Sequence, residues 1–91
     1  RKEDSDMDLE ELEDLEPEKI VDARGSACPG PLLEAKKGIG AVSVGEVLEI
    51  RSSDKGTRND IPIWANKVGH RFLGALEADE GYDRLFVERG K

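Results

Sequence analysis

A strand, a loop and a helix follow one another in IVDARGSACPGPLLEAKKGIG, residues 20–40. The apolar start of this stretch predicts a short strand, and Gly25 predicts the loop that leaves it. Pro29 keeps the residue before it, Cys28, in the extended conformation of a helix N-cap. Proline also suits the first position of a helix, so we expect a helix over residues 29–42.

The single cysteine of the chain, Cys28, stands at the start of this expected helix. Pro29 and Pro31 have no N–H group, so the free amides are those of Gly30 and Leu32, which point back toward the sulfur. A helix N-terminus favours negative charge and lowers the pKa of a thiol. We therefore interpret Cys28 as an accessible, activated thiolate. The alternative is the buried, inert role that a lone cysteine often has.

The remaining sequence alternates between strand and helix patterns. Thr57 and Asp60 form a Thr-x-x-Asp pair, which we interpret as the capping box of a second helix that Gly69 ends. Trp64 has the helical spacing of a core residue in that helix. The expected strands are residues 20–24, 46–51, 72–76 and 82–88, the last two joined by a hairpin at residues 79–81.

These elements give the order βαβαββ. Because short crossovers between parallel strands are right-handed, both helices are expected on the same side of one sheet. We predict an α/β fold, a two-layer α/β sandwich in which a four-stranded mixed sheet carries two helices on one face. The other face is expected to be open to solvent or to a partner.

The acidity of the chain belongs to its first residues. Residues 1–18 hold ten acidic and two basic side chains, a balance of −8, whereas residues 19–91 hold eleven and twelve, a balance of +1. We predict that residues 1–18 are an acidic, solvated tail or linker and that residues 19–91 form one folded domain. The spacing of Leu9, Leu12 and Leu15 leaves a loose helical face for a partner as the alternative.

Several kinds of chemistry do not fit these residues. One cysteine allows neither an internal disulfide nor dithiol exchange within the chain. One cysteine and one histidine do not make a zinc site, and the glycines match no phosphate-binding loop, so we expect no metal and no cofactor. The nearly neutral domain does not indicate nucleic-acid binding, and no stretch has membrane-spanning length. A reactive thiol fits the cytoplasm best.

Two loops are expected at the end of the sheet where the parallel strands end. The loop before the second helix brings Asp54, Arg58 and Asp60 beside Cys28, although turn formation and capping explain the two acidic residues equally well. His70 follows the helix end, where a partly charged imidazole is favourable, and we prefer this role to that of a base for the cysteine. The basic residues expected near the cysteine, as possible contacts for an acidic partner, are Arg24, Lys36, Lys37 and Arg58.

These motifs closely resemble those of the TusA-like (SirA-like) sulfur-carrier proteins, which share a Cys-Pro-x-Pro motif. The resemblance implies the βαβαββ sandwich, a persulfide on Cys28, and a place near it for Asp60. The chain departs from the family pattern at Gly30, the variable motif position, and at Gly38 and Gly40, which lead us to expect an early end of the first helix. The resemblance covers residues 19–91 and rests on segments 21–25, 28–33, 45–50, 54–62, 64 and 69–70.

The resemblance also implies a function. Cys28 is expected to accept sulfane sulfur as a persulfide and to relay it to an acceptor protein, as a relay rather than a stand-alone catalyst. The implied donors are a cysteine desulfurase or a rhodanese, and the implied acceptor is DsrE-like or similar. The pathways open to such a carrier are tRNA thiolation, molybdenum cofactor synthesis and sulfur oxidation. The motif residues expected to stabilise the persulfide are Pro29, Gly30, Pro31 and Leu32.

We expect a monomer, because a carrier presents its cysteine to two successive partners. The alternative function is a non-catalytic interaction or regulatory module in which Cys28 is incidental.

Overall fold

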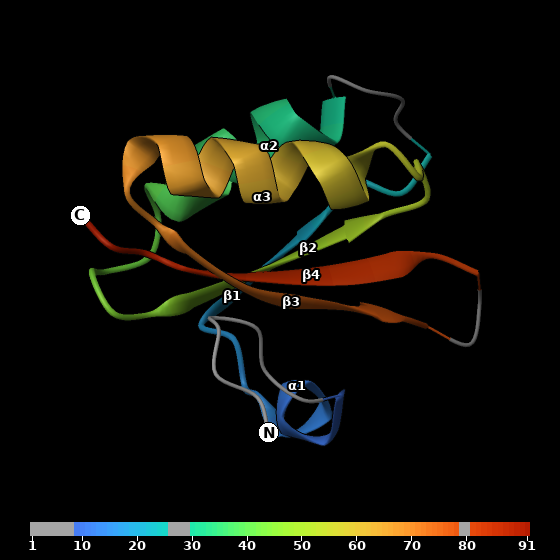
Figure 1. The fold of residues 1–91 in the computed structure, drawn as a ribbon, viewed down its shortest axis with the longest axis horizontal. Helices are drawn as coiled ribbons and strands as arrows, with labels where there is room; N and C mark the ends of the chain where they lie inside the picture. The colour runs from blue at the N-terminus through green and yellow to red at the C-terminus, as the bar shows by residue number, and fades with distance from the viewer. Residues whose placement is uncertain (1–8, 26–29, 79–80) are drawn as a thin grey trace.

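The computed structural model describes residues 9–25, 30–78 and 81–91. In chain order its elements are α1 (Leu9–Asp14), β1 (Lys19–Asp22), α2 (Gly30–Ile39), β2 (Val47–Ser52), α3 (Thr57–Val68), β3 (Arg71–Glu77) and β4 (Asp83–Glu88). The described strands form one sheet in the order β1-β2-β4-β3, with β1 parallel to β2 and the other pairs antiparallel. Helices α2 and α3 cover one face (Figure 1). The predicted α/β sandwich with its mixed sheet is confirmed.

The main core lies between the sheet and the two long helices. Leu48 and Ile50 of β2 are fully buried beneath them, and Ala35 of α2 and Ile61 of α3 pack against the same cluster. Trp64, predicted as a core residue, is 8% exposed and belongs to this cluster. Burial of one stripe of each helix against one face of the sheet holds the two layers together.

Helix α2 ends at Ile39, before the predicted end at residue 42 and as its glycines lead us to expect. Gly38 is buried against the sheet. An ideal Cβ at Gly38 would lie 2.6 Å from Val21 Cγ2 and 3.0 Å from Leu48 Cδ1. The glycine that weakens the helix by its propensity therefore also lets it approach β1 and β2 closely.

Helix α3 begins without the predicted capping box. Its N-cap is Gly56, and no side chain caps the first turn. The Thr57 hydroxyl is buried and forms a hydrogen bond of 2.7 Å with the Ser52 hydroxyl instead. The capping-box prediction is wrong because burial turns Thr57 toward β2. The predicted end is confirmed, since Gly69 has φ 95° and its N–H donates to the carbonyl of Ala65.

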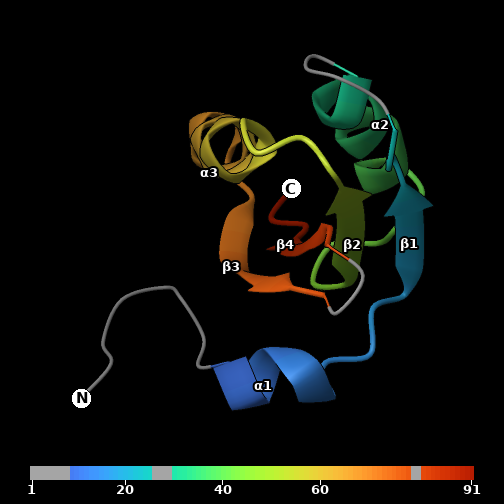
Figure 2. The same cartoon turned by 90° about the vertical axis from the view of Figure 1, so that its right-hand side faces the viewer.

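Within the acidic segment, for which the sequence favours a solvated tail, Leu9–Asp14 form helix α1. Leu12 is 1% exposed and packs with Phe86 in a second apolar cluster, on the face opposite α2 and α3 (Figure 2). The Glu18 N–H donates to the carbonyl of Val47 at 2.9 Å, and the Val47 N–H donates to Glu18 Oε1 at 2.8 Å. The sheet face expected to be open is thus partly covered by the chain's own segment.

None of the helices in the described part of the chain combines the length and the apolar character needed to cross a membrane.

Candidate functional site

The candidate site lies where α2 begins. Cys28 and Pro29 lie outside the described residues, and the description resumes at Gly30, the first residue of the helix. Pro31 is fully buried, and Leu32 is half-buried and packs against the main core. Cys28 therefore precedes, by two positions in the sequence, a helix start that is anchored in the core.

The start of α2 carries the partial positive charge of a helix N-terminus. The first N–H groups of an α-helix have no partner within it, and Pro31 has no N–H, so the amides of Gly30 and Leu32 are the available donors. The first turn contains no Asp or Glu. The partial positive charge of the helix end is therefore not neutralised by a carboxylate of its own first turn, and it favours an anion beside Gly30.

The loop that leaves β1 is tied to the loop that leaves β2. Gly25 has φ 88°, and its N–H donates to Ser53 Oγ at 2.9 Å. The Ala23 N–H donates to the carbonyl of Arg51 at 2.8 Å, which extends the pairing of the two strands. The two loops that the sequence brings to one end of the sheet are thus joined there by hydrogen bonds.

Asp54 builds the turn before α3. Its N–H donates to Ser52 Oγ at 3.0 Å, and its Oδ1 accepts from the Gly56 N–H at 2.9 Å. Asp60 is half-buried in the first turn of α3, where its N–H donates to the carbonyl of Gly56 at 3.0 Å. These contacts give Asp54 a structural role, and they fix Asp60 at the same end of the sheet as the start of α2.

Arg58 lies at this end of the sheet and is paired with a carboxylate. Its Nε is 3.1 Å from Asp83 Oδ2, and its Nη2 donates to Asp83 Oδ1 at 3.1 Å. The Asp83 side chain is only 1% exposed. The burial of Asp83 was not predicted, although an acidic residue shortly before the apolar run of residues 85–87 is a signal that could have indicated it.

Arg24 is paired in the same way with Asp22, with Nε at 2.8 Å from Oδ1 and Nη2 at 2.6 Å from Oδ2. The hydrogen bonds from Arg24 lower the pKa of Asp22 to about 2. Each of these ion pairs is neutral overall, so neither arginine adds net charge to the site. Among the described residues at this end of the sheet, the start of α2 is a feature that favours an anion.

Lys36 and Lys37 do not lie at this end of the sheet. Both belong to the last turn of α2, and Lys36 lies about 9 Å along the helix axis from Gly30. Lys37 Nζ is 3.8 Å from Glu34 Oε2 in an exposed pair. Their distance from Cys28 lies outside the described residues, so a role for these lysines in contacting a partner stays a prediction.

His70 follows the C-terminal end of α3, at the opposite end of that helix from Thr57. Burial, followed by the nearby charges of Arg89 and Lys91, lowers its pKa. Its Nδ1 accepts a hydrogen bond from the Gly90 N–H at 3.0 Å. The histidine thus belongs to the helix terminus as expected, but it favours the neutral form rather than the partly charged one.

Metal binding has no support in residues 9–25, 30–78 and 81–91, where no three His, Cys, Asp or Glu side chains gather as potential ligands.

The fold and the helix start define a class of small α/β domain that carries a cysteine ahead of its first sheet-covering helix. A solved SirA-like protein from Desulfitobacterium hafniense has the same fold, with a TM-score of 0.70 over 80% of this chain and 99% of that chain at 24% identity. Residues 19–89 match the family described as Sulfurtransferase TusA. The chain belongs to the TusA family.

Relatives of known sequence agree with this assignment. A putative sulfur carrier protein of Archaeoglobus fulgidus is 47% identical over 72 residues, which are 79% of this chain and 97% of that protein. The sulfur carrier protein TusA of Pseudomonas putida is 34% identical over 66 residues, 72% of this chain and 82% of that protein. The putative sulfur carrier protein YrkF of Bacillus subtilis is 42% identical over 71 residues, 78% of this chain but only 38% of that protein.

Proposed function

We propose that the protein is a sulfur carrier, which holds sulfane sulfur on Cys28 as a persulfide and relays it to an acceptor protein. The observation that carries this proposal is the match of residues 19–89 to the TusA family, a segment that contains the cysteine and the helix start after it. The names of the relatives in Archaeoglobus fulgidus and Pseudomonas putida support the same role.

The proposed reaction is an exchange between thiolates and persulfides. In loading, the Cys28 thiolate attacks the outer sulfur of a donor protein's persulfide. A new S–S bond forms on Cys28, the donor's S–S bond breaks, and the donor cysteine leaves as a thiolate. In transfer, a thiolate of the acceptor protein attacks the outer sulfur of the Cys28 persulfide. The S–S bond on Cys28 breaks, and Cys28 leaves as a thiolate. No external oxidant or reductant enters either step.

The start of α2 suits both steps, because an anion resides on Cys28 before loading and again after transfer. Donors at this position are the amides of Gly30 and Leu32, and the helix dipole adds to their effect. Pro29 and Pro31 restrict the backbone on both sides of Gly30. In this proposal Asp54, Arg58 and Asp60 shape the loop that a partner meets beside the cysteine.

The proposal extends to partners and compartment. Proteins that generate persulfides, such as a cysteine desulfurase or a rhodanese, are the class of donor, and a DsrE-like thiol protein is the class of acceptor. We propose a monomer in the cytoplasm, where a reducing environment keeps a single thiol available. The pathway served is tRNA thiolation, molybdenum cofactor synthesis or sulfur oxidation.

Intact-protein mass spectrometry after incubation with polysulfide tests the proposal. The wild type should gain sulfur atoms that a reductant removes, and the Cys28→Ser protein should gain none. Circular dichroism of the variant controls for its fold. Equal loading of Cys28→Ser, or no loading of a wild type whose thiol is still open to alkylation, overturns the proposal.

A further inference from the structure

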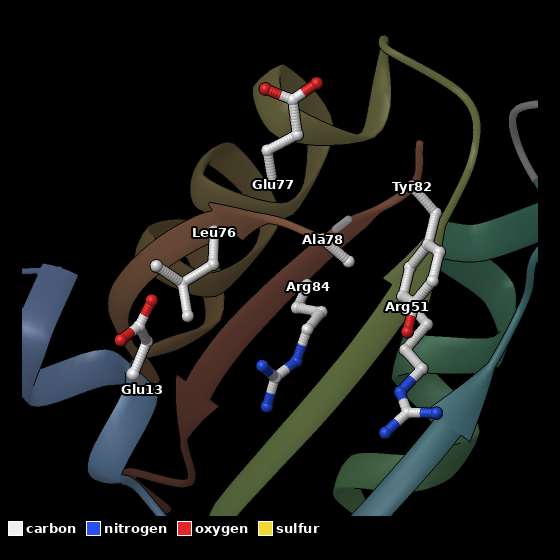
Figure 3. Close-up of a pocket in the computed structure, with 7 residues that line it drawn as sticks. All are labelled: Glu13, Arg51, Leu76, Glu77, Ala78, Tyr82 and Arg84. Atoms are coloured by element: carbon white, nitrogen blue, oxygen red, sulfur yellow. The ribbon is translucent and has the colours of Figure 1, made fainter. Parts of the chain in front are cut away.

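The face of the sheet opposite α2 and α3 holds a cleft of about 480 Å³ (Figure 3). Its lining includes Arg51 of β2 and Arg84 of β4, with Leu76 and Tyr82 beside them. The carboxylates of Glu13 in α1 and Glu77 in β3 also line it. This volume lies within the range of small-molecule sites. The cleft is separate from the start of α2, which lies on the helix-covered side.

Arg51 and Arg84 lie directly opposite each other on neighbouring antiparallel strands. Like charges in this cross-strand position repel each other. One carboxylate, Glu49, holds both, since Arg51 Nε and Arg84 Nε are 2.7 and 3.0 Å from Glu49 Oε2. The Glu49 side chain is only 1% exposed. Burial alone would raise the pKa of Glu49, but the hydrogen bonds from Arg84 and Arg51 outweigh burial and lower it, so the carboxylate stays charged.

Two cations and one carboxylate leave this cluster with a positive charge. Among the described residues, neither arginine has a second carboxylate within ion-pair distance. Asp22 is the register partner of Arg51 on β1, but its carboxylate is held by Arg24. The hydrogen bonds to Glu49 use Nε of Arg51, and Nε and Nη2 of Arg84. With respect to the described part of the chain, the Nη groups of Arg51 and Nη1 of Arg84 therefore remain as donors.

Tyr82 restricts the arginines further. Its ring centroid is 4.7 Å from Cζ of Arg24 and 6.0 Å from Cζ of Arg51. Figure 3 shows the ring beside the Arg51 side chain at the margin of the cleft. Contact with an aromatic face and a buried carboxylate limits the freedom of a guanidinium group, so less entropy is lost when it binds a ligand.

We propose that this cleft binds a small oxyanion, with N–H groups of Arg51 and Arg84 as the donors. Planar guanidinium groups match the oxygen atoms of carboxylates and related oxyanions, and charge assistance strengthens these hydrogen bonds. The ligand places a second negative charge in direct contact with the two arginines, which among the described residues have only Glu49 within ion-pair distance. Glu13 also lines the cleft, and the negative charge of its carboxylate opposes the binding of an anion there.

Thiosulfate is the probe for this site, titrated into the full chain with the Nε–Hε signals of the arginines followed by NMR. Saturable shifts of Arg51 and Arg84 are expected in the wild type. Arg51→Gln should weaken binding by about tenfold or more, because a charge-assisted donor is lost. Glu13→Gln should strengthen it about twofold to fivefold by removing an exposed like charge. Sodium chloride at matched ionic strength is the comparison titration.

Arg71→Gln is the matched control, since Arg71 is an exposed arginine paired with Glu88 at the other end of β3 and β4. It should leave the affinity unchanged. Arg84 is tested as Arg84→Lys, which keeps a positive charge beside Glu49 so that the sheet stays folded. The titration of the wild-type protein tests the proposal without any variant. Shifts that chloride reproduces, or equal affinity in Arg51→Gln, overturn the proposal. Cys28→Ser should bind thiosulfate normally, so this test is independent of the persulfide test.

Discussion

Leu12 fills the space that a side chain on Gly74 would need. An ideal Cβ at Gly74 would lie 2.7 Å from Leu12 Cδ1, and Gly74 has φ 147°, a conformation that favours glycine. The pairing of β3 with β4 also shifts register between Phe72 and Gly74. The family match begins at Lys19, so this contact joins a segment outside the family domain to its sheet.

This relationship predicts coupled effects on stability. Gly74→Ala should lower the free energy of unfolding by about 1–3 kcal/mol, from backbone strain and overpacking. Leu12→Ala should lower it by about 2 kcal/mol, through loss of a buried side chain. In the double variant the shortened side chain at position 12 no longer clashes with the new Cβ. Its loss of unfolding free energy should therefore be smaller than the sum of the losses in the two single variants. Urea unfolding followed by the fluorescence of Trp64 measures all three, and additive costs would mean that the two residues do not touch in solution.

The contact also marks a limit of the sequence argument. The alternation of apolar and polar residues and the residue types that begin or end helices are local signals. They allow β2, the end of α3 at Gly69 and the βαβαββ order to be predicted. The placement of Leu12 depends on what the far face of the sheet offers, and charge density alone favoured a solvated tail. The prediction of the candidate site meets the same limit, because the pairing of Arg58 with Asp83 joins residues far apart in sequence.

Gly38 provides a second stability test with a matched control. Alanine at Gly38 improves helix propensity by about 1 kcal/mol, yet its Cβ would meet Val21 at 2.6 Å. We expect net destabilisation of about 1–3 kcal/mol, because overpacking exceeds the gain in propensity. At Gly40 a Cβ meets only the carbonyl of Lys37 at 3.5 Å, an ordinary contact. Gly40→Ala should therefore be neutral or slightly stabilising, and equal losses at both positions in urea unfolding would contradict the close packing of α2.

The ion pairs of Glu49 with Arg51 and Arg84 predict that the fold loses stability in acid. Its pKa in the folded protein lies below the ordinary value of 4.5, as the hydrogen bonds of Arg84 and Arg51 outweigh burial. A carboxyl with a lowered folded pKa stabilises the fold above its unfolded pKa, and this contribution is lost as pH falls from there toward the folded pKa. Glu49→Gln should be less stable by about 3 kcal/mol at pH 7.

Urea unfolding between pH 7 and pH 3 checks this, with the difference between wild type and Glu49→Gln shrinking below about pH 4.5. Asp22→Asn is the comparison, because the pKa of Asp22 is also lowered, to about 2, but its carboxylate is exposed. A difference between wild type and Glu49→Gln that stays constant across the whole range would show that the Glu49 carboxylate is not held charged by the arginines.

The last prediction concerns the charge at the start of α2. Leu33 is 51% exposed near the helix start, where the first turn has no acidic residue. Leu33→Glu places a negative charge beside the helix end and should raise the pKa of the Cys28 thiol by about 0.2–0.7 units, the equivalent of about 0.3–1 kcal/mol. Leu33→Gln has nearly the same shape without the charge and should leave that pKa unchanged.

The rate of alkylation of Cys28 as a function of pH measures the thiol pKa in both variants, and added salt should reduce the difference between them. The chain has one cysteine, so the signal is unambiguous. An equal thiol pKa in Leu33→Glu and Leu33→Gln at low salt would mean that the charge at the start of α2 does not affect Cys28. The persulfide mechanism would then need another source of anion stabilisation.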